Sequence, residues 1–363
     1  MQPTLSILRT AFAAARASRP VRHRDLAAEL GVSEGELIAA HAGLFDAAES
    51  PLKATRLQSS WPQIVQAVEA LGDVTALTRN ESCVHEKVGT YSNASGSGAM
   101  GLVLGGAIDL RVFYSAWAHG FAVQEQTAKG LQRSLQFYDA QGTAVHKIFL
   151  RESAEQADSV LAYDALVARF MLPGTDAGLQ PLPAPAPKAE KPDAEIDVAA
   201  FRADWASLRD THEFFGLLKR HGLTRTQALR LAAPEFAQAV EPSTAHEILQ
   251  RASQTGAPIM VFVGNPGMIQ IHSGPVKRVE VMGPWLNVLD PGFNLHLRED
   301  HIATAWRVRK PTSDGLVSSL ELFDAAGGTI AMFFGERKPG QAERCDWREL
   351  LDGVSPEDAT CGA

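Results

Sequence analysis

The stretch SLQFYDAQGTAVHKIFL (134–150) is closely matched by SLELFDAAGGTIAMFFG (319–335), 185 residues further along the chain. In both stretches apolar residues alternate with others, and a glycine-containing dipeptide (141–142 or 327–328) interrupts the pattern. Alternation of this kind is typical of β-strands, and such a dipeptide between two strands predicts a hairpin. Each stretch is therefore expected to form the last two strands of an antiparallel sheet.

The same shift relates many residues outside the two hairpins. It pairs Asn80 with Asn265, Gly89 with Gly274, Val103-Leu104 with Val288-Leu289, Leu110 with Leu295, Val123 with Val308 and Gly130-Leu131 with Gly315-Leu316. A register without gaps over some seventy residues indicates a duplicated domain, and a period this long indicates two domain copies and not a solenoid. We therefore expect a tandem structural duplication.

A segment rich in proline and alanine separates the two copies. Residues 173–197 contain PLPAPAPKAEKPDAE, which has too few apolar side chains to form a core and predicts a linker. A first repeat is expected over 1–172 and a second over 198–363. Each repeat begins with a helix–turn–helix pattern, at 25–43 and at 221–237, and continues with alternating strands. The expected fold class is α+β, with a large antiparallel sheet and associated helices in each half.

The composition excludes several classes of protein. The 363 residues carry a net charge of −8, which argues against a general nucleic-acid binder. The three cysteines are far apart and form no CxxC, so neither a disulfide framework nor a zinc ribbon is predicted. No apolar stretch has the length of a membrane span, and Arg9 and Arg16 interrupt the alanine-rich start where a signal peptide would need an apolar run. A cytoplasmic location is expected.

The sequence gives weak support for a DNA-binding site and for a metal site made of protein side chains alone. The second helices of the helix–turn–helix pairs lack a run of Arg, Lys, Asn and Gln to read base edges, so the pairs are interpreted as packing units. A DNA-binding regulator remains the weaker alternative. Eleven histidines are present, but no HExxH and no close pair on one helix face occurs, so a metal site made of protein side chains alone is not predicted.

The segment RDTHEFFGLLKRHGLTR (209–225) predicts an amphipathic helix that carries a histidine away from its apolar stripe. Asp210 and Glu213 fit a capping box, and Gly222 fits the helix end. The apolar stripe is Phe214, Leu217 and Leu218, whereas the other face presents His212, Phe215, Gly216 and Lys219. Such a face suits a flat, anionic, metal-bearing ligand. A solvated face is the simpler interpretation from these residues alone.

Several cations lie where they would suit an anionic ligand. In AIDLRVF, alternation puts Arg111 and Phe113 on the strand face opposite Leu110 and Val112. The others are Arg225 in the first turn of a helix, Lys310 at the end of AWRVRK, and Arg337 after the last strand. Each of these three, taken alone, is interpreted as a solvated surface charge.

Six segments resemble the bacterial cytoplasmic haem-utilisation proteins of the HemS/ChuS/PhuS type. They are VHEKVGTY (84–91), LVLGGAIDLRVF (102–113), THEFFGLLKRHGLTR (211–225), MVFVGNPGMIQIHSG (260–274), WLNVLDPGFNLHL (285–297) and AWRVRKPTSDGLVSSLELFDAAGGTIAMFFGER (305–337). The resemblance covers nearly the whole chain, and RKPTSDG followed by SLELF is its most specific part. It implies a duplicated fold with two large antiparallel sheets, and haem b as ligand or substrate in the second half.

The resemblance also implies roles for individual residues. His212, in THEFF, would be the proximal ligand of haem iron, with Phe215 and Gly216 beside the porphyrin edge. Arg111 would be the distal arginine, with Phe113 as its aromatic neighbour. Arg225, Lys310 and Arg337 would be the basic residues near the propionates. In the last strand, Met332 and Phe334 replace the polar residue and tyrosine that are frequent in the family, which implies a less polar distal side.

Two functions are consistent with the resemblance. In one, the protein is a haem-degrading monooxygenase in which Arg111 stabilises negative charge that develops during oxygen activation. In the other, it is a haem carrier that delivers its cargo to a separate haem oxygenase. The partners implied are a haem-uptake transporter, a haem oxygenase or a reductase. No sequence feature separates the two.

Overall fold

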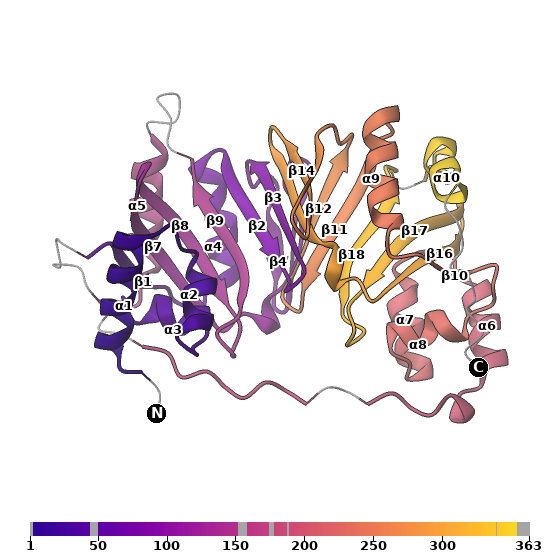
Figure 1. The fold of residues 1–363 in the computed structure, drawn as a ribbon, viewed down its shortest axis with the longest axis horizontal. Coiled ribbons are helices and arrows are strands. Elements are labelled where there is room, and N and C mark those ends of the chain that lie inside the picture. Colours follow the sequence, from indigo (N-terminus) through magenta and orange to yellow (C-terminus); the bar gives the residue numbers. More distant parts are fainter. Residues whose placement is uncertain are drawn as a thin grey trace. The chain divides into compact units, whose positions relative to one another are not determined.

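The computed structural model describes residues 3–43, 50–151, 158–173, 178–186, 189–338 and 340–353 (Figure 1). They form two compact units. Unit 1 comprises Met1–Arg79, Glu86–Pro185 and Asn265–Gln270, and unit 2 comprises Asn80–His85, Ala186–Gly264 and Ile271–Ala363. The division falls inside the predicted linker, at Pro185. It differs from the predicted halves in two short segments. Asn80–His85, from the first half, belongs to unit 2, and Asn265–Gln270, from the second half, belongs to unit 1. We refer to these two as the exchanged segments.

The first half of the chain contains five α-helices and nine strands among its described residues. The helices are α1 (Leu5–Ser18), α2 (His23–Glu29), α3 (Glu34–Ala39), α4 (Trp61–Ala67) and α5 (Asp158–Phe170). The strands are β1 (Leu52–Arg56), β2 (Val74–Arg79), β3 (Cys83–Gly89), β4 (Ser95–Ser97), β5 (Met100–Val103), β6 (Asp109–Phe113), β7 (His119–Thr127), β8 (Gly130–Tyr138) and β9 (Ala144–Leu150).

The second half repeats this composition within its described part. Its helices are α6 (Val198–Ala206), α7 (Glu213–His221), α8 (Arg225–Leu231), α9 (Thr244–Thr255) and α10 (Cys345–Asp352). Its strands are β10 (Ala237–Val240), β11 (Ile259–Asn265), β12 (Met268–Gly274), β13 (Val279–Met282), β14 (Trp285–Asp290), β15 (Phe293–Arg298), β16 (Thr304–Thr312), β17 (Gly315–Phe323) and β18 (Thr329–Gly335). Within the described residues, no helix combines the length and apolar character required to cross a membrane.

The strands build two nine-stranded antiparallel sheets. Their orders are β1-β7-β8-β9-β2-β3-β15-β14-β13 and β10-β16-β17-β18-β11-β12-β6-β5-β4. The two orders are the same when each strand is replaced by its counterpart in the other half. The α+β class with two large antiparallel sheets is therefore confirmed.

The duplication is visible in the strand register. Three pairings repeat at the shift of 185: Ser134↔Phe149 with Ser319↔Phe334, His119↔Tyr138 with Thr304↔Phe323, and Val74↔Leu150 with Ile259↔Gly335. Both hairpins also carry a register shift at the corresponding place, after Phe137 and after Leu322. The turn glycines Gly142 and Gly327 have φ angles of 77° and 78°, a conformation that favours glycine over residues with a Cβ. The predicted repeat and both predicted hairpins are confirmed.

Each exchanged segment begins with an asparagine that is held in the same way. The side-chain amide of Asn80 donates to two backbone carbonyls of unit 2, and that of Asn265 donates to the corresponding two in unit 1. The acceptors are Gly264 at 3.1 Å and Ile330 at 2.8 Å for Asn80, and Arg79 at 2.9 Å and Val145 at 2.8 Å for Asn265. Each exchanged segment is therefore joined by side-chain hydrogen bonds to the unit that contains it.

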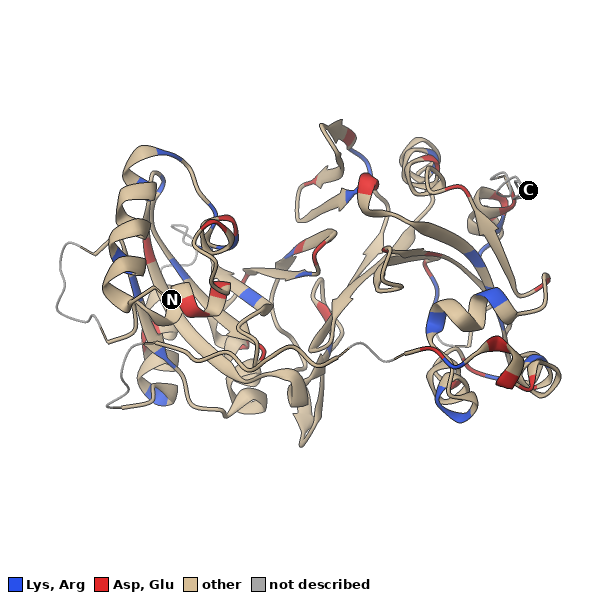
Figure 2. Ribbon diagram, turned by 60° about the horizontal axis from the view of Figure 1, so that its bottom comes forward, with Lys and Arg blue, Asp and Glu red and all other residues tan. Residues whose placement is uncertain are grey.

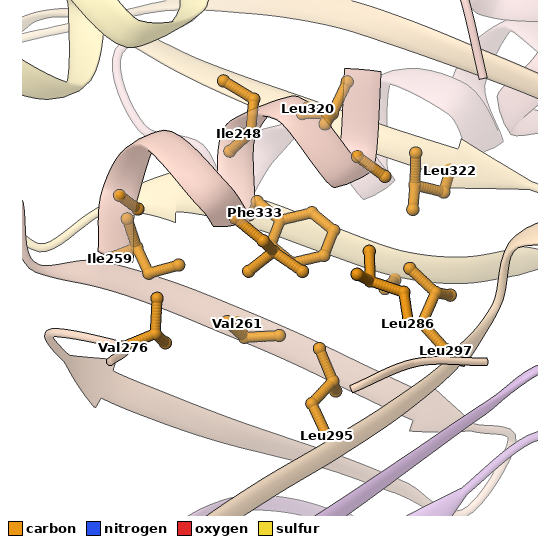
Figure 3. Packing of buried hydrophobic residues seen from close by; sticks show 14 of the residues in the cluster. Ile248, Ile259, Val261, Val276, Leu286, Leu295, Leu297, Leu320, Leu322 and Phe333 are labelled. Carbon is orange, nitrogen blue, oxygen red and sulfur yellow. The ribbon is translucent and has the colours of Figure 1, made fainter. Parts of the chain in front are cut away.

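The core of unit 2 fills the space between its strands and the helices α9 and α10 (Figure 3). Apolar side chains from alternate strand positions, such as Val261 and Leu286, pack against Ile248 of α9 and Phe333 of β18. Cys83 of the exchanged segment belongs to the same cluster and is fully buried. Burying a large apolar side chain contributes about 1.5–3 kcal/mol, so this cluster fixes the sheet on which the candidate site is built.

Candidate functional site

His212 lies immediately before helix α7, and 88% of its side chain is exposed. Its Nδ1 is 2.6 Å from Oδ1 of Asp210, and the same oxygen accepts the backbone N–H of His212 at 2.8 Å. The carboxylate has no proton to donate at neutral pH, so the hydrogen bond assigns the imidazole proton to Nδ1. The lone pair is then on Nε2. A carboxylate partner of this kind orients a metal-binding histidine, so His212 is suited to bind a metal through Nε2.

The start of this helix differs from the prediction. The Glu213 carboxylate accepts a hydrogen bond from the backbone of Arg209 at 2.9 Å, and α7 begins at Glu213 instead of just after Asp210. The predicted capping box of Asp210 and Glu213 is therefore wrong, because the Asp210 side chain binds His212. The rest is confirmed: Gly222 ends the helix at φ 69°, and the predicted apolar stripe is buried.

The surface next to His212 is open and partly aromatic. The Phe215 side chain follows within one helical turn, and the residue is 76% exposed. A Cβ atom added at Gly216 would meet only the Nη1 atom of Arg220, at 3.7 Å. An imidazole, an exposed ring and a position without a side chain thus adjoin one another, as the sequence predicts.

Arg225 and Lys310 converge on one buried carboxylate, that of Glu321, which no sequence motif indicated. Arg225, the first residue of α8, donates from Nε and Nη2 to Glu321 at 2.7 and 2.8 Å. Lys310 in β16 donates to the same carboxylate at 2.7 Å. The ring of Phe214 lies 5.2 Å from the Arg225 guanidinium and 4.6 Å from the Lys310 ammonium. We refer to Arg225, Lys310 and Glu321 as the Glu321 cluster.

The charges of the Glu321 cluster depend on one another. Burial alone would raise the pKa of Glu321, but the charges of Arg225 and Lys310 outweigh it and hold this pKa far below its usual range. Burial lowers the pKa of Lys310, which Glu321 partly offsets. With all three groups ionised the cluster carries one net positive charge. The interpretation of Lys310 as a solvated surface charge is wrong, because the residue is only 3% exposed.

The two unusual residues of the last strand lie beside this cluster. The Met332 sulfur accepts a hydrogen bond from Nη2 of Arg225 at 3.3 Å. The ring of Phe334 is 6.0 Å from Nζ of Lys310. A thioether and a phenyl ring therefore adjoin the two cations, which makes this wall of the site weakly polar.

Arg337 follows β18 and is half-buried. Its Nη1 is 3.9 Å from the Asp314 carboxylate and 3.4 Å from the Gln341 carbonyl. The pKa of Asp210 is lowered by hydrogen bonds from His212 and, to a smaller extent, by the charge of Arg337. Arg337 therefore acts electrostatically on the carboxylate that orients His212.

Arg111 and Phe113 belong to unit 1. They lie on one face of β6, opposite the fully buried Leu110 and Val112, so the predicted alternation is confirmed. The Arg111 side chain is 31% exposed and forms an ion pair with Asp109 on the same face. Within each unit, basic and acidic residues are interspersed along the elements (Figure 2).

The chain belongs to the family defined by the haemin-degrading HemS.ChuX domain, whose model matches residues 31–170 and 222–354. The hemin transport protein HmuS of Yersinia pestis is 41% identical over 349 residues, which are 96% of this chain and 97% of that protein. The holo structure of PhuS, a heme-binding protein from Pseudomonas aeruginosa, is 47% identical with a TM-score of 0.92, covering 98% of this chain and 100% of PhuS. ChuS, an Escherichia coli heme oxygenase, is 37% identical with a TM-score of 0.82, covering 96% and 99%.

Proposed function

We propose that this protein binds haem b in the cytoplasm as part of a haem-uptake system, and carries the haem, degrades it to release iron, or does both. The observation that carries the proposal is the exposed His212 imidazole, whose Nδ1 is bonded to Asp210 so that Nε2 is available to a metal. Relatives described as heme-binding, as hemin transport proteins and as a heme oxygenase support it. A haem-uptake transporter would supply the haem, and a reductase or a separate haem oxygenase would act with the protein.

The side chains around His212 fit the shape and charge of haem. The exposed Phe215 and the open position at Gly216 would accept the edge of a flat macrocycle. When bound, haem supplies an iron that takes a protein ligand and a conjugated ring on which oxygen chemistry occurs. Arg111, with Phe113 on the same face of β6, is proposed as a haem-contacting residue on the family resemblance.

The cations would act on the propionates in different ways. Arg225 keeps 26% of its side chain exposed although it binds Glu321, so it would reach a carboxylate directly. Lys310 is buried and would act through its electrostatic field. Arg337 is half-buried and ion-paired only at 3.9 Å, so it would exchange Asp314 for a propionate at little cost.

Replacing Arg337 by alanine is expected to weaken haem binding by about 0.5–3 kcal/mol, because a charge-assisted hydrogen bond or a field contribution is lost. The penalty should largely vanish with haem whose propionates are methyl esters, since the esters carry no charge. Both affinities are measured by titration of the Soret band. Arg278→Ala is the control, because Arg278 pairs with Glu280 at an exposed position. An equal penalty with haem and with the diester would show that Arg337 does not recognise carboxylates.

Replacing Arg111 by alanine tests whether the protein is a haem-degrading enzyme or a haem carrier. If the protein degrades haem, ascorbate in air should bleach the Soret band and release chelatable iron with catalase present. Arg111→Ala should then slow bleaching far more than it weakens haem binding, because a fixed cation stabilises charge that develops only during the reaction. Lys129→Ala, at an exposed turn between β7 and β8, should leave the rate unchanged. If bleaching stops when catalase removes free peroxide, the haem-degrading function is contradicted and the haem-carrier function is supported.

A further inference from the structure

A chain of hydrogen bonds connects four buried side chains in unit 1. The Tyr91 hydroxyl is 2.5 Å from Nε2 of His146, and Nδ1 of His146 is 2.8 Å from the Thr78 hydroxyl. The Thr78 hydroxyl is also 2.8 Å from Oε1 of Gln270. All four residues are at most 1% exposed. The proposed haem site does not use these polar groups.

The bonding pattern fixes the position of each proton. The Gln270 amide nitrogen donates to the Ala76 carbonyl at 2.9 Å, so its oxygen faces Thr78 and accepts the hydroxyl proton. Thr78 has then used its single proton and must accept from Nδ1–H of His146. Nε2 of His146 is therefore unprotonated and accepts from the Tyr91 hydroxyl. Burial lowers the pKa of His146 to about 3, which agrees with a neutral ring at pH 7.

The hydroxyl of Tyr91 donates to an imidazole nitrogen, whereas the hydroxyls of two other buried tyrosines donate to amide oxygens. Tyr138 donates to the side-chain amide oxygen of Gln136 at 2.6 Å, and Tyr163 donates to the backbone carbonyl of Ser134 at 3.1 Å. An amide oxygen is a very weak base, and an imidazole nitrogen is a stronger one even where burial lowers its pKa. Tyr91 is thus a phenol with a built-in proton acceptor.

Oxidisable aromatic rings lie next to His146 in the same unit. The Trp117 ring is 6.4 Å from the His146 ring, and the rings of Trp61 and Tyr114 lie 6.1 and 5.6 Å from Trp117. Trp61 and Trp117 are each 5% exposed and Tyr114 is 6% exposed, so each of these buried residues keeps a small solvent-accessible area. An electron can therefore leave the buried Tyr91 in short steps between aromatic rings.

We propose that Tyr91 is a site of reversible one-electron oxidation, reached through Trp117 and coupled to proton transfer to His146. An electron passes from Tyr91 to a one-electron oxidant outside the core, and the hydroxyl proton moves to Nε2 of His146. The products are a neutral tyrosyl radical and an imidazolium, and a one-electron reductant reverses both transfers. Oxidants formed when haem meets peroxide are the physiological candidates, and this use of the site rests on the proposed function.

The first experiment uses the haem-free full chain and a photogenerated ruthenium(III) polypyridyl oxidant, with the radical detected by EPR after freezing. A tyrosyl signal is expected, and it should be lost in Tyr91→Phe but kept in Tyr163→Phe, the matched control. His146→Gln keeps Tyr91 but replaces its proton acceptor by an amide, which is not a base. The radical yield should therefore fall by about tenfold or more. A signal that persists in Tyr91→Phe, or a yield that His146→Gln leaves unchanged, would overturn the proposal.

If either variant fails to fold, an experiment on the unaltered protein tests the proposal. A nitroso spin trap is added during photo-oxidation, and the adduct is located by peptide mapping. An adduct on Tyr91 supports the proposal, and adducts confined to other residues contradict it. A second arm replaces the ruthenium complex by haem and hydrogen peroxide. A Tyr91 radical with ruthenium but not with bound haem would refute only the use with haem, whereas failure to bind haem would refute only the proposed function.

Discussion

Replacing His212 by alanine is expected to lower the affinity for haem by about tenfold or more and to alter the Soret band, because the iron loses its protein ligand. The His212 side chain is 88% exposed, so the free energy of unfolding should change by no more than about 0.5 kcal/mol. A loss of affinity can then be assigned to the ligand and not to the fold. Titration of haem into both proteins, followed by absorbance, measures the effect.

His221→Ala is the matched control on the same helix. Nε2 of His221 already bonds the Asp204 carboxylate at 2.9 Å, and its ring contacts Phe201, so haem binding should be unchanged. Asp210→Ala should produce an intermediate loss, because it removes the group that orients His212. An unchanged spectrum and affinity in His212→Ala would exclude this residue as the iron ligand.

Replacing Glu321 by glutamine is expected to destabilise the protein by about 3–5 kcal/mol at neutral pH, because Lys310 and Arg225 would lose the buried carboxylate that compensates them. Glutamine is a conservative choice, since the corresponding position in the first half is occupied by Gln136. Urea unfolding followed by circular dichroism measures the change. Glu280→Gln, which breaks an exposed ion pair, should cost no more than about 1 kcal/mol.

The effect of Glu321→Gln should depend on pH with a defined sign. The folded protein holds the pKa of Glu321 well below the ordinary value of 4.5, so its carboxylate contributes stability fully above that value. This contribution is lost as the pH falls below about 4.5, and the difference between wild type and variant should shrink there. Adding Lys310→Met to Glu321→Gln should restore much of the stability by removing the buried cation. If the difference in unfolding free energy between wild type and Glu321→Gln did not depend on pH, Glu321 would not be ionised in the folded protein.

The sequence predicted the fold well because the duplication presents the same pattern twice. Alternating residues and turn glycines at a constant shift mark the hairpins of both halves, and the strand pairings follow that shift. His212 was singled out because it lies off an apolar stripe, and its role as iron ligand is inferred from the family resemblance. That stripe is buried in the structure, as expected.

The Glu321 cluster and the exchanged segments were not predictable in the same way. In SLELF, Glu321 alternates with Leu320 and Leu322, which indicates a solvated strand face, yet both faces of this part of β17 are buried. Local alternation does not reveal that α8 covers the second face with Arg225. The exchange of Asn80–His85 and Asn265–Gln270 depends on contacts between distant parts of the chain, and short-range patterns carry no information about them.

The exchanged segment Asn265–Gln270 has a consequence for how the protein is made. Ribosomes release the chain from its N-terminus, and unit 1 needs Asn265 to bond Arg79 and Val145, and Gln270 to bond Thr78. The first half emerges with these positions unfilled, and translating from Pro185 to Gln270 takes on the order of ten seconds. During that interval the nascent first half lacks the asparagine that bonds Arg79 and Val145, so unit 1 can be completed only after part of unit 2 has been synthesised.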